Sequence, residues 1–140
     1  MSMSMYVILS LSDVPNTNSL NELSEQLNTP VQYLENVDLK KHTGFLPVKL
    51  KGEDSGVETF MSPLSEFSDY FPAFDSSAFI EPVVVTFRWG GDMNEMVVAL
   101  NSAYLLGYQK NSATFEPQSG VFLSNEQVKE GAEAMSANGI

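Results

Sequence analysis

An unbroken apolar run in the second half of the chain, Pro82-Val-Val-Val-Thr-Phe87, restricts the fold more than any other feature. A strand whose consecutive side chains are nearly all apolar cannot leave one face in water, so both of its faces have to be covered. Such a strand needs other strands beside it and further layers on both sides. We therefore expect a central sheet strand over residues 82–87.

Helices are predicted where capping residues precede apolar residues at helical spacing. The capping pairs are Ser19 with Glu22, Asp92 with Glu95, and Ser124 with Gln127. Pro30 ends the first of these helices. The second is the longest, and we expect it to reach about Tyr108 with one apolar face made of Met93, Met96, Val97, Leu100 and Tyr104. Ser62-Pro63 predicts an additional short helix that ends near Phe71.

The other predicted strands surround these helices. A first strand is expected over residues 6–11 and another within 31–38, where the apolar spacing leaves the period open. Two hairpins are predicted, one with strands 44–50 and 57–61 around a turn at 51–56, the other over 113–123 with its turn at 117–120. This order predicts an α+β fold, with a mainly antiparallel sheet and helices on one face. We expect a single domain over residues 1–140, in which residues 72–82 form a loop.

The net charge of the chain restricts the classes of macromolecule that it can bind. The chain has 18 acidic and 7 basic residues, which gives a formal charge of −11. Such a field repels nucleic-acid phosphates and anionic lipid and attracts basic proteins. Solubility alone is the competing explanation. We expect no direct nucleic-acid or membrane binding.

Cysteine is absent, which excludes disulfides, thiolate metal sites and a cysteine nucleophile. No apolar stretch approaches the length of a membrane-spanning helix. The apolar run that starts at Tyr6 has no Lys or Arg before it, so it does not match a secretory signal. We expect a cytoplasmic protein, in which residues 1–5 can include an alternative start.

No group of residues predicts catalysis. His42 is the only histidine and lies in a Lys-Lys-His-Thr-Gly stretch, where a solvated side chain is the simplest interpretation. A serine triad would need this histidine, and no Gly-x-Ser-x-Gly motif presents a serine. One histidine without cysteine cannot form a nitrogen–sulfur metal site. We therefore expect a protein without enzymatic activity, cofactor or metal.

Carboxylates leave one alternative open, a small carboxylate-based enzyme or ligand-binding domain. Its acids would come from a set of five: Asp54, Glu58, Asp92, Glu95 and Glu116. Paired acids meet only in three dimensions, so sequence alone does not exclude them. A deep pocket ringed by several of these residues would favour this alternative. A double-stranded-DNA mimic is a third hypothesis, ranked last because the acids are scattered.

Acids and aromatic residues occur together between Glu66 and Glu81, a range that we call the acidic–aromatic segment. It contains four acids, five aromatic residues and no base. Rings beside carboxylates are typical of interfaces with basic proteins, where rings anchor and charges steer. Phe67 and Phe71 are expected to pack on the core. The residues predicted to contact a partner are Glu66, Asp69, Tyr70, Phe74 and Asp75.

Three stretches together resemble immunity proteins encoded beside polymorphic bacterial toxins of contact-dependent or type VI secretion systems. The stretches are His42–Leu50 continuing to Ser55–Phe60, Thr86–Asp92, and Leu105–Tyr108 with Phe115–Ser124. They cover less than half of the chain, and Glu116 stands where similar proteins often have Asp. The resemblance implies a cytoplasmic protein that occludes one cognate toxin and has no catalytic residues. A basic toxin, such as a nuclease, would suit the charge of this chain.

Overall fold

The computed structural model describes residues 2–67, 69–71, 73–108 and 111–139, with side chains described through residue 136. The elements in chain order are β1 (Met3–Ser10), the 3₁₀ turn η1 (Leu11–Asp13), α1 (Thr17–Leu27), β2 (Val31–Tyr33), β3 (Gly44–Leu50), β4 (Glu53–Pro63), the 3₁₀ turn η2 (Leu64–Phe67), β5 (Pro82–Trp89), α2 (Met93–Gly107), β6 (Ser112–Glu116), β7 (Val121–Leu123) and α3 (Asn125–Gly139). The predicted α+β class is confirmed.

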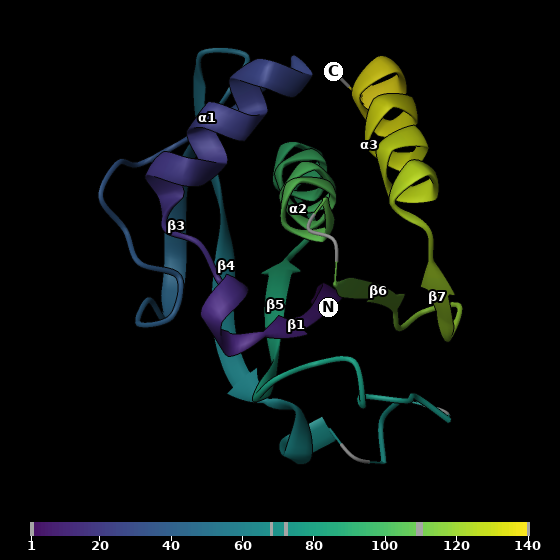
Figure 1. The fold of residues 1–140 in the computed structure, drawn as a ribbon. Helices are drawn as coiled ribbons and strands as arrows, with labels where there is room; N and C mark the ends of the chain where they lie inside the picture. The colour runs from purple at the N-terminus through teal and green to yellow at the C-terminus, as the bar shows by residue number, and fades with distance from the viewer. Residues whose placement is uncertain (1, 68, 72, 109–110, 140) are drawn as a thin grey trace.

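All strands join one antiparallel sheet of seven strands in the order β2-β3-β4-β5-β1-β6-β7. The three helices lie on one face of it, while the chain between β4 and β5 crosses the other face (Figure 1). Strand β5 occupies the middle position, as its apolar run predicts. Val83, Val85 and Phe87 belong to the core beneath the helices, whereas Val84 belongs to a second cluster on the opposite face.

Helix α2 forms the centre of the helical layer, with α3 packed along it and α1 at its other side (Figure 1). The prediction of a single apolar face on this helix is wrong. Nearly every side chain from Val97 to Gly107 is buried, while Met93, assigned to the apolar face, is 45% exposed. A helix covered by a sheet and by two other helices has no side left for water, so its buried residues lie all round it.

Two of the three predicted helix caps are confirmed. Asp92 caps α2 because its Oδ1 accepts hydrogen bonds from the backbone N–H groups of Asn94 at 2.8 Å and Glu95 at 3.3 Å. Ser124 and Gln127 form the reciprocal box that caps α3. Helix α1 differs, because the Asn16 side chain accepts the backbone N–H of Ser19 at 2.9 Å, so the helix starts three residues earlier than predicted.

The turn between β3 and β4 is shorter than predicted. Leu50 pairs with Glu53, so the turn has only Lys51 and Gly52 at its centre. Both residues have positive φ, 52° and 82°, as the two-residue turns of tight hairpins require. Polar residues 53–56, expected in a loop, therefore belong to strand β4.

The predicted helix from Ser62 to Phe71 is also wrong. Ser62 and Pro63 pair with Val84 and Val83 of β5, so β4 continues through them and only the short turn η2 follows. The expected strand within 31–38 is limited to β2, and the first strand is shifted to Met3–Ser10. Residues 68 and 72, at the end of the expected helix and the start of the expected loop, lie outside the described residues.

A buried chain of hydroxyl groups connects β2 to α2. The Ser102 hydroxyl donates to the Val98 carbonyl at 2.7 Å, and Ser102 Oγ lies 2.7 Å from the Tyr33 hydroxyl. Because Ser102 uses its proton for Val98, the Tyr33 O–H donates to Ser102. Burial raises the pKa of the Tyr33 phenol.

A second tyrosine, Tyr6, lies outside this chain of hydroxyl groups. Its pKa is raised to about 12 by burial together with the hydrogen bond to the Tyr70 hydroxyl.

Replacement of Tyr33 by Phe should lower the free energy of unfolding by about 1 kcal/mol at neutral pH, since Ser102 loses a buried donor. Because the folded pKa of Tyr33 lies above its unfolded value, its stabilising contribution is complete below about pH 10 and is lost as pH rises further. Urea unfolding at neutral and alkaline pH should show a smaller alkaline loss for Tyr33→Phe than for the parent. An equal loss would contradict this assignment.

Candidate functional site

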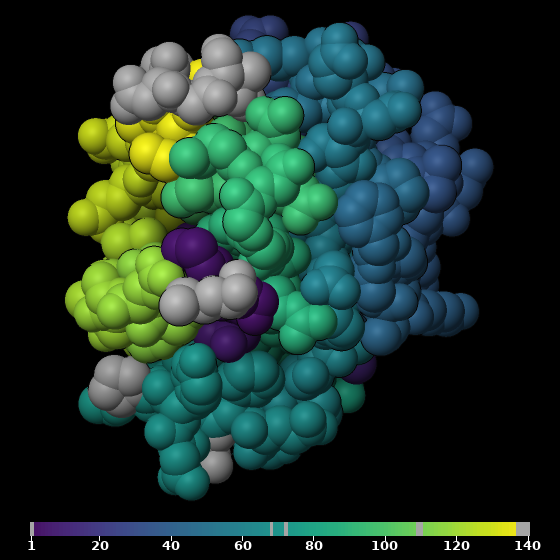
Figure 2. All heavy atoms as spheres, turned by 180° about the vertical axis from the view of Figure 1, so that it is seen from behind, coloured from purple at the N-terminus to yellow at the C-terminus, as the bar shows by residue number. Residues whose placement is uncertain are grey.

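The acidic–aromatic segment covers half of the sheet face that lies opposite the helices (Figure 1). Ile8, Val84 and Phe115 project from β1, β5 and β6 to form the sheet side of this second core, and Phe71 closes it from the segment. In Figure 2 the segment, in teal, forms the lower part of the molecule beside the β6–β7 hairpin. The segment therefore contributes to the fold as well as to the surface.

Phe71 is the ring that holds the segment in place. It is 6% exposed and packs edge-on against Phe115, with ring centroids 5.0 Å apart, and stacks on Phe67 at 5.5 Å. The expectation that Phe67 and Phe71 pack on the core is confirmed. Ring pairs in these geometries add to the stabilisation from buried area.

The five predicted contact residues fall into two groups. Glu66, Asp69 and Asp75 are exposed, and Tyr70 is 49% exposed with its hydroxyl 3.3 Å from that of Tyr6. The Phe74 ring is partly buried. The structure thus brings carboxylates and one ring to the surface here, and places the second ring within the aromatic cluster.

The remaining contacts of this group are local. Phe74 stacks on Phe122 with ring centroids 5.3 Å apart and meets Phe79 at 5.8 Å. Asp75 accepts the backbone N–H of Ser77 at 2.9 Å, and this hydrogen bond lowers the pKa of the Asp75 carboxyl. Asp75 therefore has a structural role in its turn in addition to its charge.

Replacement of Phe71 by Ala should lower the free energy of unfolding by about 3 kcal/mol or more, because a buried ring leaves a cavity. Replacement of the neighbouring half-exposed Tyr70 by Ala should lower it by only about 1 kcal/mol. Thermal or urea unfolding of both variants provides the comparison. Equal losses would show that the segment is not anchored through Phe71.

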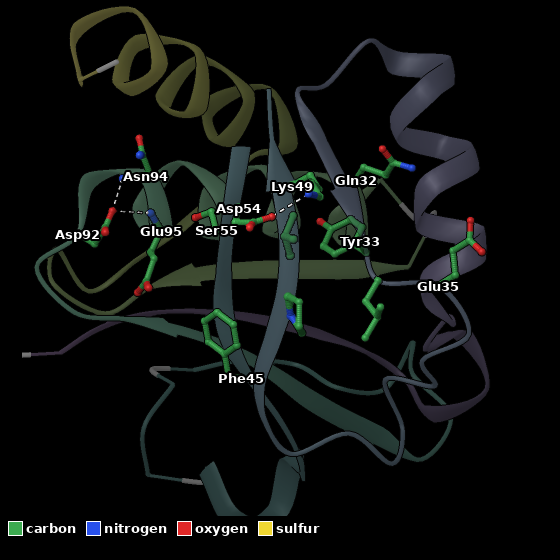
Figure 3. Close-up of a pocket in the computed structure, with 13 residues that line it drawn as sticks. Gln32, Tyr33, Glu35, Phe45, Lys49, Asp54, Ser55, Asp92, Asn94 and Glu95 are labelled. Atoms are coloured by element: carbon green, nitrogen blue, oxygen red, sulfur yellow. Dashed lines mark hydrogen bonds and ion pairs between the residues drawn. The ribbon is translucent and has the colours of Figure 1, made fainter. Parts of the chain in front are cut away.

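The other half of the same sheet face, over β2, β3 and β4, carries an open groove with a volume of about 710 Å³. We call it the β2–β4 groove; it is lined by Gln32, Tyr33, Leu34, Glu35, Phe45, Pro47, Val48, Lys49, Asp54, Ser55, Asp92, Asn94 and Glu95. Figure 3 shows Asp92 and Glu95 from the start of α2 on one side and Gln32 and Glu35 on the other. Between these sides lie the β3 and β4 strands.

Strand alternation and a short connection build this groove. Leu46, Val48 and Leu50 of β3 face the helices and are buried, so Phe45, Pro47 and Lys49 face the opposite side and are exposed. Leu34, directly after β2, is 54% exposed, and Phe45 is 52% exposed. The start of α2 reaches the groove because only Gly90, Gly91 and Asp92 separate β5 from this helix.

Acidic charge predominates along the groove. Its lining has four carboxylates and a single lysine, Lys49. The Lys49 ammonium lies 2.7 Å from Asp54, which lowers the pKa of that carboxyl and raises the pKa of the lysine. Both side chains are largely exposed, so this ion pair contributes little to stability. The groove combines apolar side chains with a surplus of negative charge.

Of the five acids named for a carboxylate-based site, Asp54, Asp92 and Glu95 line the groove, whereas Glu58 and Glu116 do not. Four of the five have structural partners: Asp54 pairs with Lys49, Glu58 with Arg88, Asp92 caps α2, and Glu116 accepts the N–H of Ser119. Among the residues that the structure describes, no three His, Asp or Glu side chains could hold a metal ion. The groove is open rather than deep.

His42 has a local structural contact. Its Nε2–H donates to the carbonyl of Phe45 at 2.9 Å and so ties the loop before β3 to the start of that strand. This contact replaces the expectation of a purely solvated side chain.

Sequence reasoning missed the apolar residues of the groove. Within the predicted strand 44–50, Leu46, Val48 and Leu50 alternate with Phe45, Pro47 and Lys49, so the two sets must face opposite sides of the sheet. A phenylalanine on the outward side of a hairpin strand was the signal that could have located this surface. The proximity of Asp92 and Glu95 had no such signal, because it depends on the packing of α2.

Comparison with known proteins finds no family model, no curated protein and no solved structure with significant similarity to this chain. Among the described residues, none of the helices has the length and apolar character needed to cross a bilayer.

Proposed function

We propose that this protein is an immunity-type binding protein, which neutralises a cognate basic toxin by occluding it in the cytoplasm of the producing cell. The observation that carries this proposal is the placement of the charges. None of the 18 acidic residues is buried, although the chain has a formal charge of −11. The negative field is therefore directed entirely towards solvent and potential partners.

Compensation of this field by the chain's own bases is small. Within the described residues, the ion pairs are Lys49 with Asp54 and Arg88 with Glu58. Arg88, the only arginine of the chain, also lies over the Phe60 ring at 4.9 Å. Most of the acids thus remain available to attract a cationic protein and to speed its association.

The stretches that resemble immunity proteins support the same function. They correspond to the loop before β3 with the β3–β4 hairpin, the join between β5 and α2, and the end of α2 with the β6–β7 hairpin. The first two contribute residues to the β2–β4 groove. Occlusion requires complementary surface and no chemistry on the part of the inhibitor, so we propose that the protein is not an enzyme. A nuclease, whose active site is basic, suits such an inhibitor.

Co-expression of this protein with the toxin encoded immediately upstream of it should restore growth of cells that the toxin alone arrests. The two proteins should also purify together as a stable complex. A catalytically inactive toxin variant provides the control for expression. If each neighbouring gene product is harmless and none purifies with this protein, the proposal is wrong.

Binding of that toxin should depend strongly on salt, because steering by unpaired carboxylates is screened by ions. Between about 0.05 M and about 0.5 M NaCl, the association rate constant should fall about tenfold or more, with a smaller change in the dissociation rate. Stopped-flow fluorescence measures both rates. A salt-independent association rate would exclude charge as the basis of recognition.

The acidic–aromatic segment is one predicted contact surface for this partner. Glu66, Asp69, Asp75 and Tyr70 reach the surface and can contact it directly, whereas Phe74 would contribute through the part of its ring that remains exposed.

A further inference from the structure

We propose that the β2–β4 groove is the principal docking surface and that it binds an arginine-bearing segment of the basic partner. This inference rests on the proposed function and assigns the surface that performs it. The occupant is defined by its chemistry: an arginine guanidinium stacked on the Phe45 ring, within the negative field of the groove carboxylates.

The first argument is that this half of the sheet face has no cover of its own. On the half over β1, β5 and β6, the acidic–aromatic segment buries Ile8, Val84 and Phe115. Over β2, β3 and β4, Leu34 and Phe45 are each more than half exposed. Exposed apolar side chains rimmed by charges are typical of protein interaction sites. A partner that covers Leu34 and Phe45 removes their apolar surface from water, and this burial favours binding.

The second argument is that Phe45 has a fixed position. Its ring lies directly over Gly56 of β4, where an added Cβ would be only 2.2 Å from the ring and 2.6 Å from the Leu46 carbonyl oxygen. The His42 side chain holds the Phe45 backbone through its hydrogen bond at 2.9 Å. A ring that is already placed loses little conformational entropy when a partner binds it.

The third argument is charge complementarity, which selects a cation as the occupant. Four carboxylates and one lysine line the groove, and that lysine is already paired with Asp54. An arginine side chain suits both features, because its planar guanidinium stacks on aromatic rings and donates to several carboxylate oxygens.

The chain contains an internal example of this arrangement on the same sheet face. Arg88 lies over the Phe60 ring at 4.9 Å while its Nε donates to Glu58 at 3.0 Å. Glu58 is also the cross-strand neighbour of Phe45. We infer that a partner's arginine adopts the equivalent position over the Phe45 ring, while the groove carboxylates attract it and the basic residues beside it.

The test uses the toxin that purifies with this protein, in a catalytically inactive form, and isothermal titration calorimetry. Phe45→Ala should raise Kd by about thirtyfold, as expected for an aromatic anchor. Tyr70→Ala, which removes a similarly exposed ring from the acidic–aromatic segment, should raise Kd less than about threefold. The reverse order would overturn the assignment. Circular dichroism checks that both variants remain folded.

A charge-matched pair of double variants tests the groove carboxylates. Glu35→Gln with Glu95→Gln removes two charges from the groove, while Glu22→Gln with Glu25→Gln removes two from the exposed side of α1. The first pair should slow association about tenfold at low salt, and the second less than about twofold. Equal effects would show that net charge, and not the groove, recognises the partner.

An octa-arginine peptide tests the groove without any toxin. Added to the isotope-labelled parent protein, it should shift the NMR signals of β2, β3 and the start of α2 most strongly. Phe45→Ala should weaken octa-arginine about threefold or more and leave octa-lysine nearly unchanged, because lysine lacks the planar group that stacks. Shifts centred on residues 66–81, or spread evenly, would overturn the assignment.

The two proposals fail in different ways. If no neighbouring toxin binds the parent protein, the proposed function is wrong, and the peptide titration still decides whether the groove selects arginine. If the toxin binds and the groove variants bind it as tightly as the parent, the groove assignment alone is wrong.

Discussion

Burial of β5 on both faces is the constraint on which the other layers depend. Its alternate side chains enter two different clusters, with Phe87 beneath the helices and Val84 beneath the acidic–aromatic segment. Each cluster removes apolar surface from water, so the fold requires a cover on either side of the sheet. The helical layer forms one cover completely. The other is only as wide as the segment between β4 and β5, and this difference in width leaves the β2–β4 groove open.

Those parts of the fold that depend on local chemistry could be predicted from sequence. The apolar run of β5, the capping side chain of Asp92 and the reciprocal box of Ser124 and Gln127 each act within a few residues. Errors arose where distant parts of the chain decide the outcome. The local sequence Ser62-Pro63 is typical of a helix start. In the structure, however, both residues pair with β5, so strand β4 continues through them.

The same division applies to the candidate site. Sequence reasoning identified acids beside aromatic rings in residues 66–81, and it assigned Phe67 and Phe71 to the core correctly. It did not identify the groove, because Leu34, Phe45 and Glu95 come from three separate elements. Composition reveals that a chain is acidic, but only tertiary packing determines which acids lie next to exposed apolar side chains.

The two edges of the sheet are formed by strands of only three residues, β2 and β7. Each of these short edge strands exposes few unpaired backbone groups, so another chain could form only a short ladder with either of them. Side chains on the faces offer a larger surface for recognition. Backbone pairing is nearly independent of residue identity, whereas side-chain contacts change with every substitution. When the surface of a partner changes by mutation, single substitutions in the groove can therefore restore the fit between the two proteins. The backbone hydrogen bonds of the sheet beneath the groove are not affected by such substitutions.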